Sequence, residues 1–239
     1  MSVTAKISDA SVAAIEQDIP TRLPVTTAGM AYKILRGELI WGRWPAGQKL
    51  KPQHLKTELN ITSSSLREAL IRLAAEGFVT VEEQRGFRTL LPTEQSFREL
   101  HHLRGLLEKE GAKLSIKIAD SEWMERFQSA YHELYLFEKQ MTGKAYQDLD
   151  LRQWSLLDSA FHASLIAGCG SQILIEQYGI IYDKYRIHAV SELNEAGFRG
   201  STTMDEHYEI FVAIRDLDTA KSMLAIDRHL HIYRRANQK

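Results

Sequence analysis

The alternation of apolar and polar residues between positions 50 and 90 predicts two short helices followed by a β-hairpin. Leucines recur at steps of three or four, the spacing of one helix face, at Leu55, Leu59, Leu66, Leu70 and Leu73. The stretch 60–62 interrupts this series, so a polar turn divides it into two helices. Gly77 suits a left-handed helix end, and two short strand-like runs, 78–81 and 87–90, then flank the polar tip 82–86.

A further amphipathic helix is predicted before this region, from Thr27 to about Trp41. Its apolar stripe is Met30, Ile34, Leu35 and Leu39. Residues 1–25 contain prolines at positions 20 and 24 and few apolar side chains, so we expect a mobile arm there. The N-terminal domain is therefore predicted to cover residues 26–91, with three helices and a hairpin.

From Pro92 onward the chain shows only helical periodicity. Proline suits the first turn of a helix, and the residue before it avoids helical geometry, so a second domain is predicted over residues 92–239. Its expected helices cover residues 93–119, 121–141, 145–167, 171–193, 202–215 and 217–236. The predicted fold class is mainly α: a winged helix-turn-helix followed by an all-helical antiparallel bundle of about six helices.

The predicted N-terminal elements match a winged helix-turn-helix, in which the start of the second helix contacts base edges in the major groove. Thr62 or Ser63 can cap that helix, with help from Glu68. The candidate DNA-contacting residues are Gln53, Thr62, Ser63, Ser64, Ser65, Arg67, Arg85 and Gly86. The alternative is a small helical domain that contains the same elements without binding DNA.

The motifs LREALIRLAAEGFV and RGF, preceded by LRGELIWGRWPAGQKL and ELNIT, resemble the winged helix-turn-helix of the GntR superfamily of bacterial transcription regulators. The resemblance covers about residues 26–91 and implies binding to an operator, with a homodimer on two half-sites. Two residues depart from the family pattern. The family usually has an arginine where this chain has Ser63, and a serine or threonine where it has Lys51. The first departure concerns the operator sequence and not the act of binding DNA.

Charge is divided along the chain, although the formal net charge is −1. Residues 21–91 contain 11 Lys and Arg against 6 Asp and Glu, whereas residues 92–239 contain 18 against 22. DNA phosphates attract the first segment and repel the second, although a basic surface that only faces solvent would show the same charge pattern.

The sequence also predicts a soluble cytoplasmic protein. It contains a single cysteine, Cys169, and has neither a membrane-length apolar run nor a signal-peptide pattern.

Four residues of the second domain form a candidate metal-ligand set. Asp158 and His162 stand four positions apart, on one face of one predicted helix, and His207 and His229 lie on two others. One carboxylate and three imidazoles suit a divalent transition metal, with zinc first and nickel, manganese or iron as alternatives. Each histidine alone is more often a hydrogen-bonded core residue. His231 should point away from the set.

The segments DSAFH, EHYEIFVAI and DTAKSMLAIDRHL resemble the FCD ligand-binding domain of FadR-like GntR regulators. In this resemblance the four residues fall on the ligands of the metal-containing members. Arg104 falls on a family arginine that can bind the carboxylate of an effector, although it could instead pair with Glu108 on a helix surface. Arg186 is a weaker effector-binding candidate, and solvated surface is the simpler interpretation of it.

These features predict a DNA-binding regulator whose operator affinity is controlled by a small carboxylate bound near a divalent metal. Two alternatives stay open: the metal itself is the signal, or the site is a metal-dependent hydrolase with an open coordination position. We expect no enzyme, because no general base is well placed. Glu206, beside His207, should face elsewhere, and Glu176 and Asp183 have no assigned role.

Overall fold

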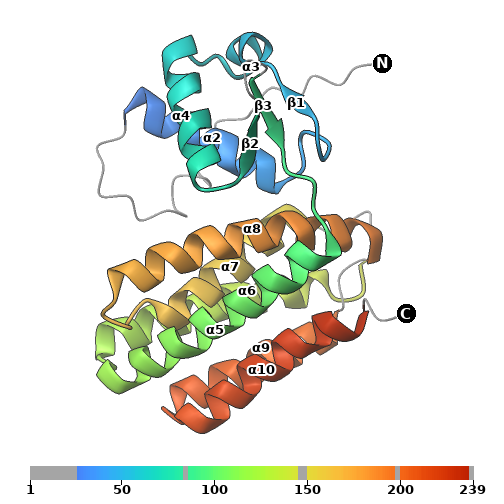
Figure 1. Cartoon of the computed structure of the whole chain (residues 1–239). Coiled ribbons are helices and arrows are strands. Elements are labelled where there is room, and N and C mark those ends of the chain that lie inside the picture. The colour runs from blue at the N-terminus through green and yellow to red at the C-terminus, as the bar shows by residue number, and fades with distance from the viewer. Residues whose placement is uncertain (1–25, 83–85, 145–149, 197–199, 237–239) are drawn as a thin grey trace. The chain divides into compact units, whose positions relative to one another are not determined.

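The computed structural model describes residues 26–82, 86–144, 150–196 and 200–236 (Figure 1). The predicted arm at residues 1–25 lies outside this part of the chain. The described residues form two compact units that divide between Pro92 and Thr93. No helix in these ranges is long and apolar enough to cross a lipid bilayer.

The first unit is a winged helix-turn-helix, as predicted. Its helices are α2 (Thr27–Ile40), α3 (Pro52–Leu59) and α4 (Ser63–Ala75), and its strands are β1 (Lys49–Leu50), β2 (Val79–Glu82) and β3 (Gly86–Thr89). The three strands form an antiparallel sheet in the order β1-β3-β2. The sequence predicted only the β2–β3 hairpin, because a strand of two residues is too short to show alternation. Helices α2 and α4 pack together, and Leu35, Leu66 and Leu70 are fully buried between the elements.

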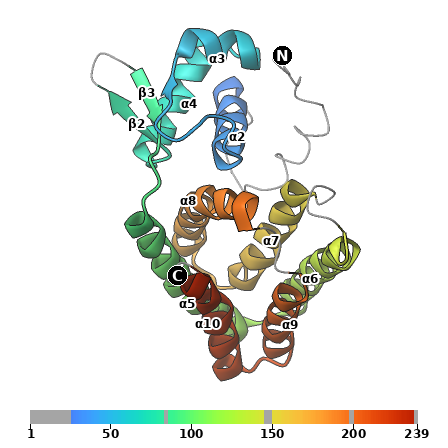
Figure 2. The ribbon, with the colours of Figure 1, turned by 90° about the vertical axis from the view of Figure 1, so that its right-hand side faces the viewer.

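The second unit is helical throughout its described residues, which confirms the predicted fold class. Its helices are α5 (Glu94–Ile118), α6 (Ser121–Met141), α7 (Leu151–Ile166), α8 (Gln172–Ala196), α9 (Ser201–Arg215) and α10 (Thr219–Ala236). Figure 2 shows them nearly end-on, arranged around a common interior. Helix α5 contacts α7, α8 and α10, so it borders three of its neighbours. The predicted helix at 145–167 begins at Leu151, and residues 145–149 lie outside the described part.

Helix α5 starts with a capping box at the boundary between the units. The Thr93 hydroxyl accepts a hydrogen bond from the Ser96 amide, and the Ser96 hydroxyl accepts one from the Thr93 amide, both at 3.0 Å. Further along, α5 approaches α7 very closely at Gly111, where an added Cβ would lie 2.5 Å from Ile166. The missing side chain therefore allows the two helices to bring Glu108 and His162 together, one turn away.

Candidate metal and DNA-binding sites

The turn before α4 is held by two of the residues predicted to contact DNA. Thr62 is the N-cap of α4: its hydroxyl oxygen accepts a hydrogen bond from the Ser65 amide at 3.3 Å and donates to the Ser65 hydroxyl at 2.9 Å. Ser65 is buried, so its hydroxyl shapes the turn. Ser63 and Ser64 face solvent. The predicted capping role of Glu68 was wrong, since its exposed carboxylate makes no hydrogen bond within the described part of the chain.

The arginines of the first unit differ in what they contact. Four of them form ion pairs inside the unit: Arg36 with Glu76, Arg43 with Glu58, Arg72 with Glu76 and Arg88 with Glu82. The exposed Arg67 guanidinium forms no ion pair or hydrogen bond with any described residue. It is therefore available to a ligand outside the chain.

The other predicted DNA contacts lie on α3 and the wing. Gln53 is exposed near the start of α3, a helix whose N-cap residue, Lys51, makes no side-chain capping hydrogen bond. Gly86 opens β3 with φ +99°, a left-handed conformation that favours glycine. Arg85 lies outside the described residues.

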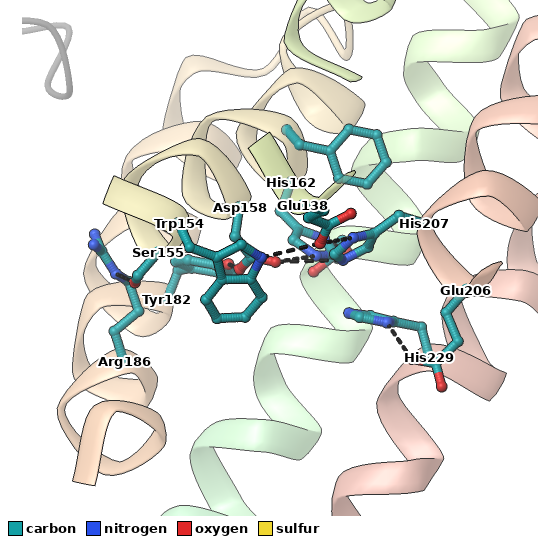
Figure 3. Close-up of polar contacts among 12 residues, drawn as sticks. Glu138, Trp154, Ser155, Asp158, His162, Tyr182, Arg186, Glu206, His207 and His229 are labelled. Carbon is teal, nitrogen blue, oxygen red and sulfur yellow. Dashed lines mark hydrogen bonds and ion pairs between the residues drawn. The ribbon is translucent and has the colours of Figure 1, made fainter. Parts of the chain in front are cut away.

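Asp158, His162, His207 and His229 come together inside the second unit (Figure 3). Helix α7 supplies the first two, α9 the third and α10 the fourth. One nitrogen of each imidazole lies within 4.8 Å of the others, and Asp158 Oδ1 lies 3.3 Å from His207 Nε2 and 3.7 Å from His162 Nε2. Zinc–nitrogen bonds of about 2.1 Å allow at most about 4.2 Å between two ligand nitrogens. A small closure would therefore bring the three imidazoles onto one ion, with Asp158 beside two of them.

A carboxylate from another helix holds the Nδ1 atom of each histidine. The pairs are His162 with Glu108 at 2.6 Å, His207 with Glu138 at 3.0 Å and His229 with Glu206 at 3.0 Å. Donation from Nδ1–H to a carboxylate leaves the lone pair on Nε2, the usual arrangement behind metal-binding histidines. The Nε2 atoms of His162 and His207 are buried and make no hydrogen bond to a described residue. This donor set fits a divalent transition metal.

The buried charges of the cluster shift the pKa values of its members in different directions. Burial alone would raise the pKa of Asp158, but His162 and His207 outweigh it and hold that pKa well below its usual range. Burial would lower the pKa of His207, yet Asp158 and Glu138 raise it to about 9. Burial and the neighbouring His207 keep the pKa of His229 well below its usual value. Metal binding must therefore displace a proton from His207.

Arg104 is buried beside this cluster. Its Nε donates to Glu108 Oε2 at 3.0 Å, and its guanidinium lies 4.5 Å from the ring centre of Tyr182 and 4.7 Å from that of Tyr185. The alternative interpretation was a pair between Arg104 and Glu108 on a helix surface. The pair exists, but it is not on the surface, because Arg104 is only 2% exposed. Its Nη2 is buried without a hydrogen-bond partner among the described residues. Burial would raise the pKa of Glu108, but His162 and Arg104 hold it well below its usual range.

Arg186 is buried as well, so the expectation of solvated surface was wrong. Its Nε donates to the Ser155 hydroxyl at 3.2 Å, and Asp183 lies 3.4 Å from its Nη1. Figure 3 shows Arg186 and Ser155 on the side of Tyr182 away from the histidines. The Tyr182 hydroxyl donates to Asp158 Oδ2 at 2.7 Å and so connects this region to the cluster.

Sequence reasoning missed the three glutamates behind the histidines. Glu206 was expected to face away from the cluster, but it reaches across to His229 on α10. Glu138 accepts from both His207 Nδ1 and the Trp154 indole nitrogen, each at 3.0 Å, although nothing in its local sequence indicates either partner. The signals that could have found them are weak: Glu108 follows Arg104 by one turn, and Glu206 adjoins a candidate ligand.

Family models match both parts of the chain. The model described as bacterial regulatory proteins, gntR family, matches residues 27–88, and the FCD domain model matches residues 99–231. The chain therefore belongs to the GntR family of bacterial regulatory proteins, in the group with an FCD domain. It is a transcription regulator of this type, and regulators of this family bind DNA operators.

Known relatives and solved structures agree with this assignment. The HTH-type transcriptional repressor GlaR of Escherichia coli (strain K12) is 27% identical over 202 residues, which cover 83% of this chain and 90% of GlaR. The HTH-type transcriptional regulator BphR of Paraburkholderia xenovorans is 31% identical over 159 residues, 65% of this chain and 64% of BphR. The structure of E. coli McbR/YncC is similar with a TM-score of 0.76 at 16% identity, covering 90% of this chain and all of that one, so this likeness is one of fold.

Proposed function

We propose that this regulator binds its operator as a homodimer, with an affinity set by a small carboxylate bound beside a divalent metal, most suitably zinc, in the FCD domain. The observation that supports this most is the set of three buried histidines and Asp158, with each histidine backed by a carboxylate. When bound, the metal would supply a Lewis acid for a carboxylate oxygen. Arg104 would add a charged N–H donor. A cytoplasmic location is part of the same proposal.

The buried glutamates favour ligand binding over catalysis. A hydrolase needs a general base within reach of a metal-bound water. Each of the three buried glutamates accepts a hydrogen bond from a histidine Nδ1 and so orients that histidine, which leaves it unsuited to act as a base: Glu108, Glu138 and Glu206. A direct metal sensor is the second candidate function, because the donor set alone would respond to the metal supply.

One experiment separates these functions. Full-length protein would be loaded with zinc or stripped with a chelator, and its affinity for a DNA duplex selected from a random library would be titrated with a panel of small mono- and dicarboxylates. The proposal expects the affinity to change with a carboxylate only in the zinc-loaded protein. A change with zinc alone would indicate a metal sensor, and turnover of an ester or amide panel would indicate an enzyme.

Arg104→Lys is expected to weaken the carboxylate response. The substitution keeps a positive charge opposite Glu108 but removes the planar fork that grips a carboxylate with two N–H groups. Regulatory coupling usually changes operator affinity about 5- to 150-fold, and the variant should retain little of that change. Fluorescence anisotropy of labelled DNA measures it. Arg98→Lys is the control, since Arg98 lies on the same helix in an exposed pair with Glu94. An undiminished response in Arg104→Lys would exclude this role.

Arg67→Ala is expected to weaken binding to the selected duplex by about 1–3 kcal/mol, because an arginine that meets a base edge contributes about that much. Binding to random DNA should change less. Arg126→Ala serves as control, since Arg126 is an exposed arginine of α6 paired with Glu122. Equal losses on both duplexes would mark Arg67 as a phosphate contact.

Light scattering of the protein–DNA complex tests the proposed homodimer. A single protomer bound to the duplex would refute it.

A further inference from the structure

Helix α4 presents a continuous solvent-facing stripe that includes an exposed isoleucine. Ser64, Arg67, Glu68, Ile71 and Ala75 follow one another at steps of one, three or four residues and are all exposed. The opposite face of α4, which includes Leu66 and Leu70, is buried. Ile71 is 53% exposed and lies one turn beyond Arg67 and Glu68. An apolar side chain thus interrupts an otherwise polar or small surface in the middle of the helix.

The charged neighbours of Ile71 make this stripe better suited to bases than to phosphates. The Arg67 guanidinium and the Glu68 carboxylate form no ion pair or hydrogen bond with any described residue. A free carboxylate beside DNA phosphates would be repelled. Base edges in the major groove instead offer guanine acceptors, cytosine amines and thymine methyl groups, which match a guanidinium, a carboxylate and an aliphatic side chain.

Small side chains flank this group at both ends of the stripe. Ser63 and Ser64 precede it, and Ala75 follows it one turn after Ile71. The family usually has an arginine at the position of Ser63, and the serine side chain is much shorter, with two heavy atoms. The start of α4 can therefore approach the floor of the groove closely. A closer approach brings the third turn of the helix, where Ile71 lies, within reach of the bases.

We propose that Ile71 recognises the C5-methyl group of a thymine in each operator half-site. Ile71 lies four positions after Arg67, or about 6 Å further along the helix axis. At about 3.4 Å per base pair, the thymine lies about two base pairs from the base that Arg67 contacts. This inference rests on the proposed function, in which α4 is the recognition helix, and it adds a residue that determines which operator is bound.

Uracil substitution tests the contact one methyl group at a time. Zinc-loaded full-length protein would first select duplexes from a random library, and each thymine of the enriched half-site would then be replaced by uracil. One replacement is expected to lower wild-type affinity about fourfold, the equivalent of about 0.8 kcal/mol for one buried methyl-sized group. Ile71→Ala should bind thymine and uracil duplexes equally. Leu136→Ala, at an aliphatic residue of α6 that is 57% exposed, should behave as wild type.

The outcomes separate this inference from the proposed function. If no uracil weakens wild-type binding, or if the same uracil weakens wild type and Ile71→Ala alike, the methyl contact is refuted while operator binding stands. If the library yields no enriched sequence, or if Arg67→Ala enriches the same sequence with equal affinity, α4 is not the recognition helix and both fail. Circular dichroism confirms that Ile71→Ala is folded, as expected for an exposed helical position.

Discussion

His207→Ala is expected to abolish the stabilisation of the helical unit by zinc. A ligand that binds only the folded state stabilises it by about 2.7 kcal/mol when its free concentration is a hundred times Kd. For a domain of this size that corresponds to roughly 5–11 °C in the thermal midpoint. His207 supplies a buried Nε2 from α9, and the ligand set exists only when α7, α9 and α10 are packed together. Calorimetry of full-length protein, with zinc and with chelator, measures the difference.

The comparison within each variant isolates the metal from the packing change. The alanine also removes a buried ring, which lowers the midpoint with or without zinc, so the zinc-dependent shift is the quantity to compare. His102→Ala is the matched control, because His102 lies exposed on α5. The metal assignment would be wrong if the wild type shows no zinc-dependent shift, or if His207→Ala retains all of it.

Glu108→Leu is expected to destabilise the metal-free protein by about 3–5 kcal/mol, the usual cost of removing one partner from a buried ion pair. Glu108 is fully buried and accepts hydrogen bonds from Arg104, His162 and the Tyr178 hydroxyl. Its loss leaves the buried guanidinium of Arg104 without its carboxylate. Urea unfolding in chelator measures the free energy of unfolding without any contribution from a metal.

Two further variants show whether the unpaired charge of Arg104 causes the loss of stability in Glu108→Leu. Adding Arg104→Met to Glu108→Leu should recover much of the loss, because an apolar pair can replace a buried ion pair at little cost. Glu110→Leu should change the free energy of unfolding by no more than about 1 kcal/mol, since Glu110 forms an exposed pair with Lys113 on the same helix. A loss as large in Glu110→Leu, or no recovery in the double variant, would contradict this account.

The features that sequence predicted well are those that short-range spacing determines. Leucine periodicity placed α3 and α4, and the four-residue step from Asp158 to His162 put both on one face of α7. Thr62 and Ser63 were equal cap candidates from composition, and the structure selects Thr62. Such features depend on neighbours within one or two helical turns, so the local sequence contains most of the information.

The features that sequence missed depend on contacts between distant residues. Glu108 and His162 are 54 positions apart, and Glu138 and His207 are 69 apart, so no local period connects them. Arg186 was expected in solvent because charged side chains are rarely buried without a partner, and its contact with Ser155 joins two different helices. Strand β1 exists because Leu50 pairs with Phe87 across the sheet.

The capping box at Thr93 has a consequence for the evolution of the family. Thr93 and Ser96 each accept a hydrogen bond from the other's backbone amide, so the capping of α5 comes from residues of the second unit itself. The two family models likewise match on either side of this point, ending at residue 88 and beginning at residue 99. Recombination between relatives at Pro92 would therefore exchange the DNA-binding domain while leaving the FCD domain whole.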